Sequence, residues 1–196
     1  MPVKETDAQL LGRAAGGDEA AFLLLYRLHR DTLFRFAYRM LGSVEVAEDV
    51  TQDCFLSVLK QPERFDETRA SLRTYLCAAA RNLALKHFRG LGRETALEDV
   101  PAETIVMASV PDEPLRRVIK AELIEKVRGA IENLPPLQRE ALILFEYEEF
   151  TLAEIAAIAG ADMGTIKARL YRARQSLRRT LAPYLKVSEA AALEKR

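Results

Sequence analysis

Helical periodicity, cut into segments by capping and chain-reversal signals, constrains this chain more than any other feature. Apolar residues recur every three or four positions along most of the 196 residues, and no convincing alternating run of β-branched residues occurs. Helix-starting residues, glycines and prolines divide the pattern into segments. The sequence therefore predicts an all-α fold of two small helical domains joined by a flexible linker, with a helix-turn-helix in the C-terminal domain.

The first domain is expected over residues 1–89 and contains four predicted helices. They cover about residues 7–15, 19–41, 44–60 and 72–89. Asp18, Ser43 and Ser71 precede the last three and are typical N-cap residues, while Gly42 and Pro62 stop helices. The third helix carries acidic and amide side chains on a stripe beside its apolar face.

The character of the chain changes between residues 90 and 114. This stretch has glycines early, prolines late and no clear period, and we interpret it as the linker. A short helix over Thr104–Met107 is compatible with its sequence. At the other end of the chain, residues 186–196 form a tail that fits either a helix extension or a frayed end.

The second domain is expected over residues 115–185. Its predicted helices cover about residues 115–134, 137–148, 152–159 and 163–181, the last ending before Pro183. Thr151 and Glu154 fit a capping box, Gly160 permits a tight reversal, and Asp162 can cap the final helix. A capped short helix, a glycine turn and a longer helix are the signature of a helix-turn-helix.

The charge of the final helix is one-sided although the chain has 29 basic and 29 acidic residues. "GADMGTIKARLYRARQSLRR", residues 160–179, has six basic residues and a single acid, and residues 163–188 have none. A solvated helix face normally mixes signs, so this pattern favours DNA binding. The groove-facing candidates are Thr165, Lys167 and Arg169, and the phosphate-facing candidates are Arg172, Arg174 and Arg178.

A second acid-free stretch, residues 68–93, lies in the first domain. Each helical block therefore carries a cationic surface of its own. Two weak contacts on one tether bind a single duplex more tightly than either alone, because the tether raises the effective concentration of the second.

Catalytic, metal and membrane functions find no support in the sequence. Cys54 and Cys77, with His29 and His87, match no disulfide framework or metal-ligand spacing. We identify no nucleophile–base pair or phosphate loop, so we expect a protein that is not an enzyme and takes no cofactor. No apolar run could span a bilayer, and "MPVKETDAQL" has no signal region, so a cytoplasmic protein without membrane insertion is expected.

Three segments together resemble bacterial sigma factors of the sigma-70 superfamily, in particular the small extracytoplasmic-function (ECF) group. They are "AEDVTQDCFLSVLKQPERFD" (47–66), "LRTYLCAAARNLALKHFR" (72–89) and "LPPLQREALILFEYEEFTLAEIAAIAGADMGTIKARLYRARQSLR" (134–178). Their order and separation make the resemblance far more specific than a helix-turn-helix alone.

The resemblance implies a function and a partner for each segment. A protein of this family binds core RNA polymerase, reads the −35 and −10 promoter elements, helps melt the −10 region, and is commonly held by an anti-sigma factor. The implied polymerase-binding residues are Glu48, Asp49, Gln52, Asp53 and Phe55. The implied −10 residues are Arg73, Tyr75, Arg81, Asn82, Lys86 and Arg89. The implied −35 residues are Arg139, Thr165, Lys167, Arg169, Arg172, Arg174 and Arg178.

Two departures and two alternatives accompany the resemblance. Tyr75 stands where the family often has Trp, and Lys86 where it often has an acid. Two roles are open for the acidic residues of the linker. They either imitate the charge of nucleic acid where the linker passes the RNA in the polymerase, or they only keep a flexible tether hydrated. The alternative function is a helix-turn-helix regulator that acts without being a polymerase subunit, for which the chain shows no sensor-domain pattern.

Overall fold

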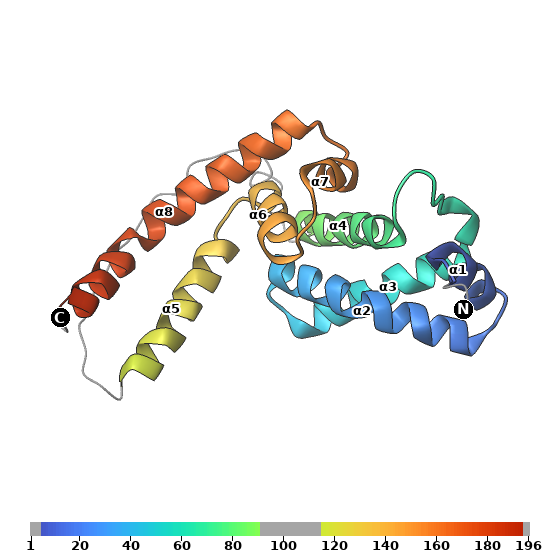
Figure 1. Ribbon diagram of the computed structural model, residues 1–196, viewed down its shortest axis with the longest axis horizontal. Helices are drawn as coiled ribbons and strands as arrows, with labels where there is room; N and C mark the ends of the chain where they lie inside the picture. Colours follow the sequence, from blue (N-terminus) through green and yellow to red (C-terminus); the bar gives the residue numbers. More distant parts are fainter. Residues whose placement is uncertain (1–4, 91–114, 194–196) are drawn as a thin grey trace.

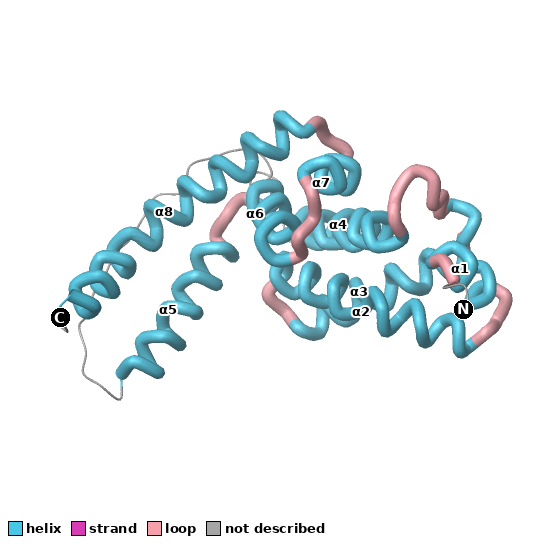
Figure 2. The backbone as a smooth tube through the Cα atoms, viewed as in Figure 1, coloured by secondary structure: helices cyan, strands magenta, loops and turns pink. Residues whose placement is uncertain are grey.

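The fold is helical throughout the part of the chain that can be described. The structure is a computed structural model that describes residues 5–90 and 115–193, and the side chains of residues 5–90 and 123–184. Within these ranges all regular structure is helical and no strand occurs (Figures 1 and 2). The all-α prediction is therefore confirmed. The predicted linker and its short helix lie outside the described residues.

Four helices form the N-terminal block, close to the predicted bounds. They are α1 (Asp7–Ala15), α2 (Glu19–Leu41), α3 (Val44–Lys60) and α4 (Leu72–Gly90), with a 3-10 turn η1 (Pro62–Arg64) after α3. Asp18 and Ser43 accept hydrogen bonds from the backbone of the first turns of α2 and α3. Gly42 ends α2 at φ 76°, a left-handed conformation that glycine adopts without strain.

The C-terminal block contains α5 (Leu115–Glu132), α6 (Pro136–Leu142), a π-helical turn η3 (Ile143–Tyr147), α7 (Leu152–Ala159) and α8 (Met163–Leu193). The sequence predicted one regular helix where α6 and η3 lie. A π turn closes its hydrogen bonds over five residues, which rotates the following side chains relative to an α-helix. Glu148 follows this turn and is buried.

The helix-turn-helix forms as its sequence predicted. Thr151 and Glu154 make the reciprocal bonds of a capping box at α7, and Gly160 reverses the chain at φ 61°. Asp162 accepts from the backbone N–H of Thr165 at 2.9 Å, which caps α8. Ile155, Ile166 and Leu170 are buried and pack α7 against α8.

The prediction that the last helix ends before Pro183 is wrong, because α8 continues to Leu193 with the proline inside it. A proline removes one backbone donor and strains the preceding turn, but it does not prevent helix on either side. The ring of Tyr184, directly after the proline, lies 5.7 Å from the ammonium of Lys126 on α5. This contact ties the continuing helix to the rest of the block.

The two blocks pack against each other. In Figure 1, α7 lies over α4, and α6 lies against the end of the α2–α3 pair, while α5 and α8 extend away together. One apolar core runs through both blocks and includes Phe36 and Leu76 of the first with Ile143 and Ile155 of the second. A smaller core, formed by Ile131, Leu134, Leu142 and Ala173, joins α5, α6 and α8.

We predict that the cap of α8 makes stability depend on pH. Hydrogen bonds from Thr165 lower the pKa of Asp162, so its contribution is complete above the unfolded-state pKa and is lost as pH falls through the lower folded-state pKa. Asp162→Asn keeps a capping oxygen but does not titrate. Urea unfolding between about pH 7 and pH 2 should show wild type losing stability relative to this variant below about pH 5. Parallel profiles for the two proteins would contradict this prediction, and Asp53→Asn on α3 serves as the control.

Candidate nucleic-acid interface

The first half of α8 presents a basic surface. Lys167, Arg172 and Arg178 are exposed along it. The hydroxyl of Thr165 donates to Asp162 at 2.6 Å, so it is occupied in the cap. Arg174 is exposed and pairs with Glu146 at 2.6 Å within the same block. The seven residues predicted to contact the −35 element stay predictions. Four of them are exposed: Lys167, Arg172, Arg174 and Arg178.

Tyr171 is an exposed residue of α8 that the sequence analysis missed. Its side chain is 65% exposed, one helical turn after Lys167. A large aromatic side chain left in solvent among cations is unusual for a packing residue. The sequence did contain a signal for Tyr171: it follows Lys167 by four residues, which places both side chains on one face of the helix.

The sequence-predicted −10 residues on α4 divide into two sets. Asn82, Lys86 and Arg89 are exposed, and their spacing places them along one face. Tyr75 is half-buried, with its ring 5.6 Å from that of Phe65 in an edge arrangement. Arg73 and Arg81 instead contact the C-terminal block.

The contact between the two blocks, which we call the seam, is rich in charge. Its N-terminal side consists of Arg35, Arg39, Arg73 and Arg81, and its C-terminal side of Arg139, Glu140, Glu148 and Phe150. Glu148 has a fully buried side chain that accepts from Arg35 and from Arg39, each at 3.0 Å. Arg73 donates to the carbonyl oxygen of Glu148, and its guanidinium lies 3.9 Å from the ring centre of Phe150.

The second carboxylate of the seam is Glu140. Its Oε1 accepts from Nε of Arg81 at 2.7 Å, and its Oε2 is buried without a hydrogen-bond partner. Burial raises the pKa of Glu140, while the nearby charges of Arg81 and Arg169 act in the opposite direction. Arg169 is half-buried and its Nη1 is enclosed without a hydrogen-bond partner. A predicted groove-reading residue is thus directed toward the protein interior.

Arg139 holds the seam from the C-terminal side. It is buried and donates to the carbonyl oxygens of Met40 at 2.6 Å, of Leu134 at 3.2 Å, and of Glu132. Its guanidinium lies 5.4 Å from the ring centre of Phe88 on α4. In this arrangement Arg139 therefore joins the two blocks and is only 7% exposed.

The predicted polymerase-binding residues on α3 also divide. Glu48, Asp49, Gln52 and Asp53 are exposed on one acidic surface. Phe55 is only 4% exposed, because its ring packs against those of Phe22 and Tyr26 at 6.3 and 5.0 Å between centres. Phe55 is therefore a core residue in this structure, and its contact with polymerase stays a prediction. Leu56 is half-exposed one turn after Gln52 and extends the acidic surface with an apolar group.

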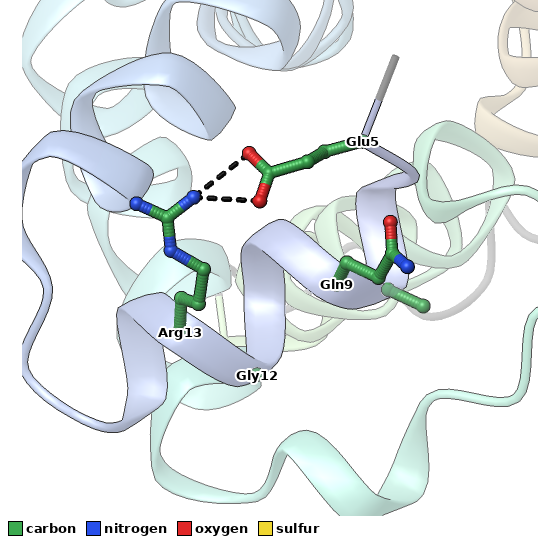
Figure 3. Close-up of a pocket in the computed structure, with 5 residues that line it drawn as sticks. Glu5, Gln9, Gly12 and Arg13 are labelled. Carbon is green, nitrogen blue, oxygen red and sulfur yellow. Dashed lines mark hydrogen bonds and ion pairs between the residues drawn. The ribbon is translucent and has the colours of Figure 1, made fainter. Parts of the chain in front are cut away.

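The other titratable groups of the described residues form no metal site and no reactive thiol. Among residues 5–90 and 115–193 no group of histidines, cysteines and carboxylates could hold a metal ion, and no helix is long and apolar enough to cross a membrane. Burial raises the pKa of Cys54 and Cys77 to about 12 each, which suppresses thiolate chemistry. A hollow beside α1 is lined by Glu5, Gln9, Gly12 and Arg13 (Figure 3). Within it, Nη1 of Arg13 donates to the two carboxylate oxygens of Glu5 at 2.7 and 2.8 Å.

Comparison with known proteins identifies the family. The family model for sigma-70 region 2 matches residues 25–94, and the model for sigma-70 region 4 matches residues 124–177. The chain is 32% identical over 171 residues to the ECF RNA polymerase sigma factor SigW of Bacillus subtilis, covering 84% of this chain and 91% of that protein. The chain belongs to the ECF sigma factors. Like other sigma factors it is a non-enzymatic subunit that directs RNA polymerase to promoters.

Further relatives agree over nearly the full length. The RNA polymerase sigma-H factor of Pseudomonas aeruginosa is 29% identical over 192 residues, which cover 95% of this chain and 99% of that protein. The sigma factor RpoE of Bartonella quintana, solved in complex with the anti-sigma factor NepR, matches with a TM-score of 0.61 and 27% identity over 82% of this chain and 96% of that one. The family assignment leaves no support for a regulator that acts apart from polymerase.

We predict that Phe55 and Asp49 have different roles although both lie on α3. Phe55→Ala removes a buried ring and should lower the free energy of unfolding by about 3–5 kcal/mol. Asp49→Ala changes an exposed side chain and should shift it by less than about 0.5 kcal/mol. Urea unfolding followed by circular dichroism measures both values. If Phe55→Ala were as stable as wild type, the burial of this ring would not contribute to the fold.

Proposed function

We propose that this sigma factor uses three separate helical surfaces: α8 for the −35 element, α4 for the −10 element, and α3 for core polymerase. The observation that supports the proposal best is their charge. Exposed cations gather on α8 and α4, and exposed acids gather on α3. Opposite signs on separate helices suit two different partners, a polyanion and a protein surface.

The −35 reader is the N-terminal half of α8. The recognition helix of a helix-turn-helix enters the major groove by its first residues, so Lys167 and Tyr171 face base edges there. Arg172, Arg174 and Arg178 lie further along the helix, where cations meet phosphate. Arg174 must exchange its pairing with Glu146 for DNA, which the exposed position of both side chains permits.

The −10 reader is the exposed face of α4 formed by Asn82, Lys86 and Arg89. Melted DNA exposes bases that can be captured by polar side chains and aromatic rings, while cations hold the strand. The lysine at position 86, where an acid is common in the family, makes the charge of this surface more positive by two units. By holding the separated strand, this face of α4 helps keep the −10 region of the promoter open.

The polymerase surface is the acidic stripe Glu48, Asp49, Gln52 and Asp53, extended by Leu56. Acids around one exposed apolar side chain resemble the rim and anchor of a protein interface. We also infer an anti-sigma partner, which is supported by the anti-sigma factor bound to the RpoE relative. Because its polymerase partner works in the cytoplasm, we propose the same location for this protein.

Run-off transcription with core polymerase and a library of promoter fragments tests the three roles. Wild type should start transcripts at a narrow promoter set. Lys167→Ala should lower transcription from these promoters by about 10-fold, equivalent to ~1.4 kcal/mol, while binding core polymerase as wild type does. Asp49→Ala should weaken the affinity for core polymerase and leave promoter choice unchanged. Equal loss of both activities in both variants would overturn the separation of roles.

The −10 surface is tested with permanganate footprinting of the melted region. We predict that Lys86→Ala reduces the reactivity of unpaired thymines, because one strand-holding charge is lost, and leaves protection of the −35 element intact. Arg64→Ala, an exposed cation of η1, is the matched control and should open promoters as wild type does. Unchanged reactivity in Lys86→Ala would remove α4 from this role.

A further inference from the structure

The recognition helix α8 packs on the rest of the C-terminal block along an apolar stripe. Ile166, Leu170 and Ala173 recur on one side of the helix and are buried. Apolar packing is non-directional, so it does not by itself fix how far a helix is turned about its own axis. Polar contacts beside the stripe are directional and can fix that rotation.

Arg169 lies beside this stripe and is turned inward. It follows Ile166 by three residues, which places it about 60° from that buried side chain around the helix. Its side chain is half-buried, and its Nη1 is enclosed without a hydrogen-bond partner. Lys167, two residues earlier, is exposed on nearly the opposite side of the helix. When Lys167 faces DNA, Arg169 therefore faces the protein.

Glu140 on α6 supplies the complementary charge. Its side chain is only 1% exposed, and α6 packs against α8 (Figure 1). Its Oε1 accepts from Nε of Arg81, while its Oε2 is buried without a hydrogen-bond partner. Burial opposes the ionisation of Glu140, whereas the positive charges of Arg81 and Arg169 favour it. An enclosed acceptor on α6 and an enclosed donor on α8 thus carry opposite charges.

We propose that Glu140 is a positioning residue for promoter recognition, because it holds Arg169 and thereby fixes the rotation of α8 about its axis. This inference rests on the reading of the −35 element by α8 proposed above, and it assigns Arg169 to the protein interior instead of to a base. The contact lies within the C-terminal block. A rotation of about 20° moves a side-chain end by about 2 Å at a helix radius of about 5–6 Å. Hydrogen bonds to bases span only about 2.7–3.2 Å, so such a rotation breaks those of Lys167.

A second carboxylate on the same segment, Glu146, offers a matched comparison. It pairs with Arg174 at 2.6 Å, and the side chains are 43% and 45% exposed. An exposed pair contributes little and exchanges easily, whereas a buried carboxylate depends on its cationic partner. Replacement of Glu140 or Glu146 by glutamine removes one negative charge and raises the affinity for all DNA sequences alike. Only the loss of a positioning contact changes the preference among sequences.

The experiment measures the −35 preference of the full-length protein bound to core polymerase, on promoter fragments with a randomised −35 element and a fixed −10 element. Sequencing of the bound fragments gives the ratio of binding to the preferred sequence over binding to single-base changes. The base pairs compared are those at which Lys167→Ala loses preference. Glu140→Gln should lower this ratio by at least about 5-fold, whereas Glu146→Gln should keep it within about 2-fold of wild type.

Arg169 supplies the second half of the test. Arg169→Gln should lower the ratio at the same base pairs, and adding it to Glu140→Gln should have little further effect, since the contact is already broken. If Arg169 read a base itself, Arg169→Gln would instead lose preference at a base pair that Glu140→Gln leaves unchanged. Circular dichroism shows whether each variant is folded. Because Arg169 is only half-buried, its replacement gives the measurement even if Glu140→Gln unfolds.

The inference is overturned if folded Glu140→Gln keeps the wild-type ratio, if Glu146→Gln lowers the ratio equally, or if the effects of the Glu140 and Arg169 replacements add. These outcomes leave the proposed function standing as long as wild type prefers a −35 sequence and Lys167→Ala loses that preference. Absence of any −35 preference in wild type would refute the proposed function of α8, and this inference with it.

Discussion

The buried carboxylate of Glu148 is the interaction on which the arrangement of the two blocks depends. It lies at the end of a π-helical turn, is completely enclosed, and is held by Arg35 and Arg39 of α2. A buried charge without partners is strongly unfavourable, so the C-terminal block can take this position only where α2 supplies cations. Arg73 and Phe150 complete the contact around the same residue.

The chain has no net charge, yet it presents separate surfaces of opposite sign. Acids and bases are sorted onto different helices: α3 carries exposed acids, and α8 and α4 carry exposed cations. Where acids and bases do meet across the blocks, they form the seam. At the seam, guanidinium groups therefore pair with buried carboxylates inside the protein.

Local signals in the sequence predicted the helices because each is fixed by residues close together in the chain. Asp18, Ser43, Thr151 and Asp162 cap helices by bonds that span three residues, and Gly160 reverses the chain through its own φ. Prediction was weaker where a distant contact intervened. Pro183 was expected to end α8, but the helix continues and Tyr184 meets Lys126 of another helix. Likewise, the resemblance placed Phe55 among the polymerase-binding residues, whereas in the fold its ring packs against those of Phe22 and Tyr26.

The sequence by itself determined the all-helical class, the helix-turn-helix, the segregation of charge and the family, since these follow from periodicity, caps and motif order along the chain. Only the tertiary structure decided which charged residues are available. Arg81 and Lys86 belong to the same acid-free basic stretch, yet Arg81 pairs with Glu140, 59 residues away, and Lys86 remains in solvent. The physical reason is that burial and ion pairing depend on the packing of distant segments, which no local pattern encodes.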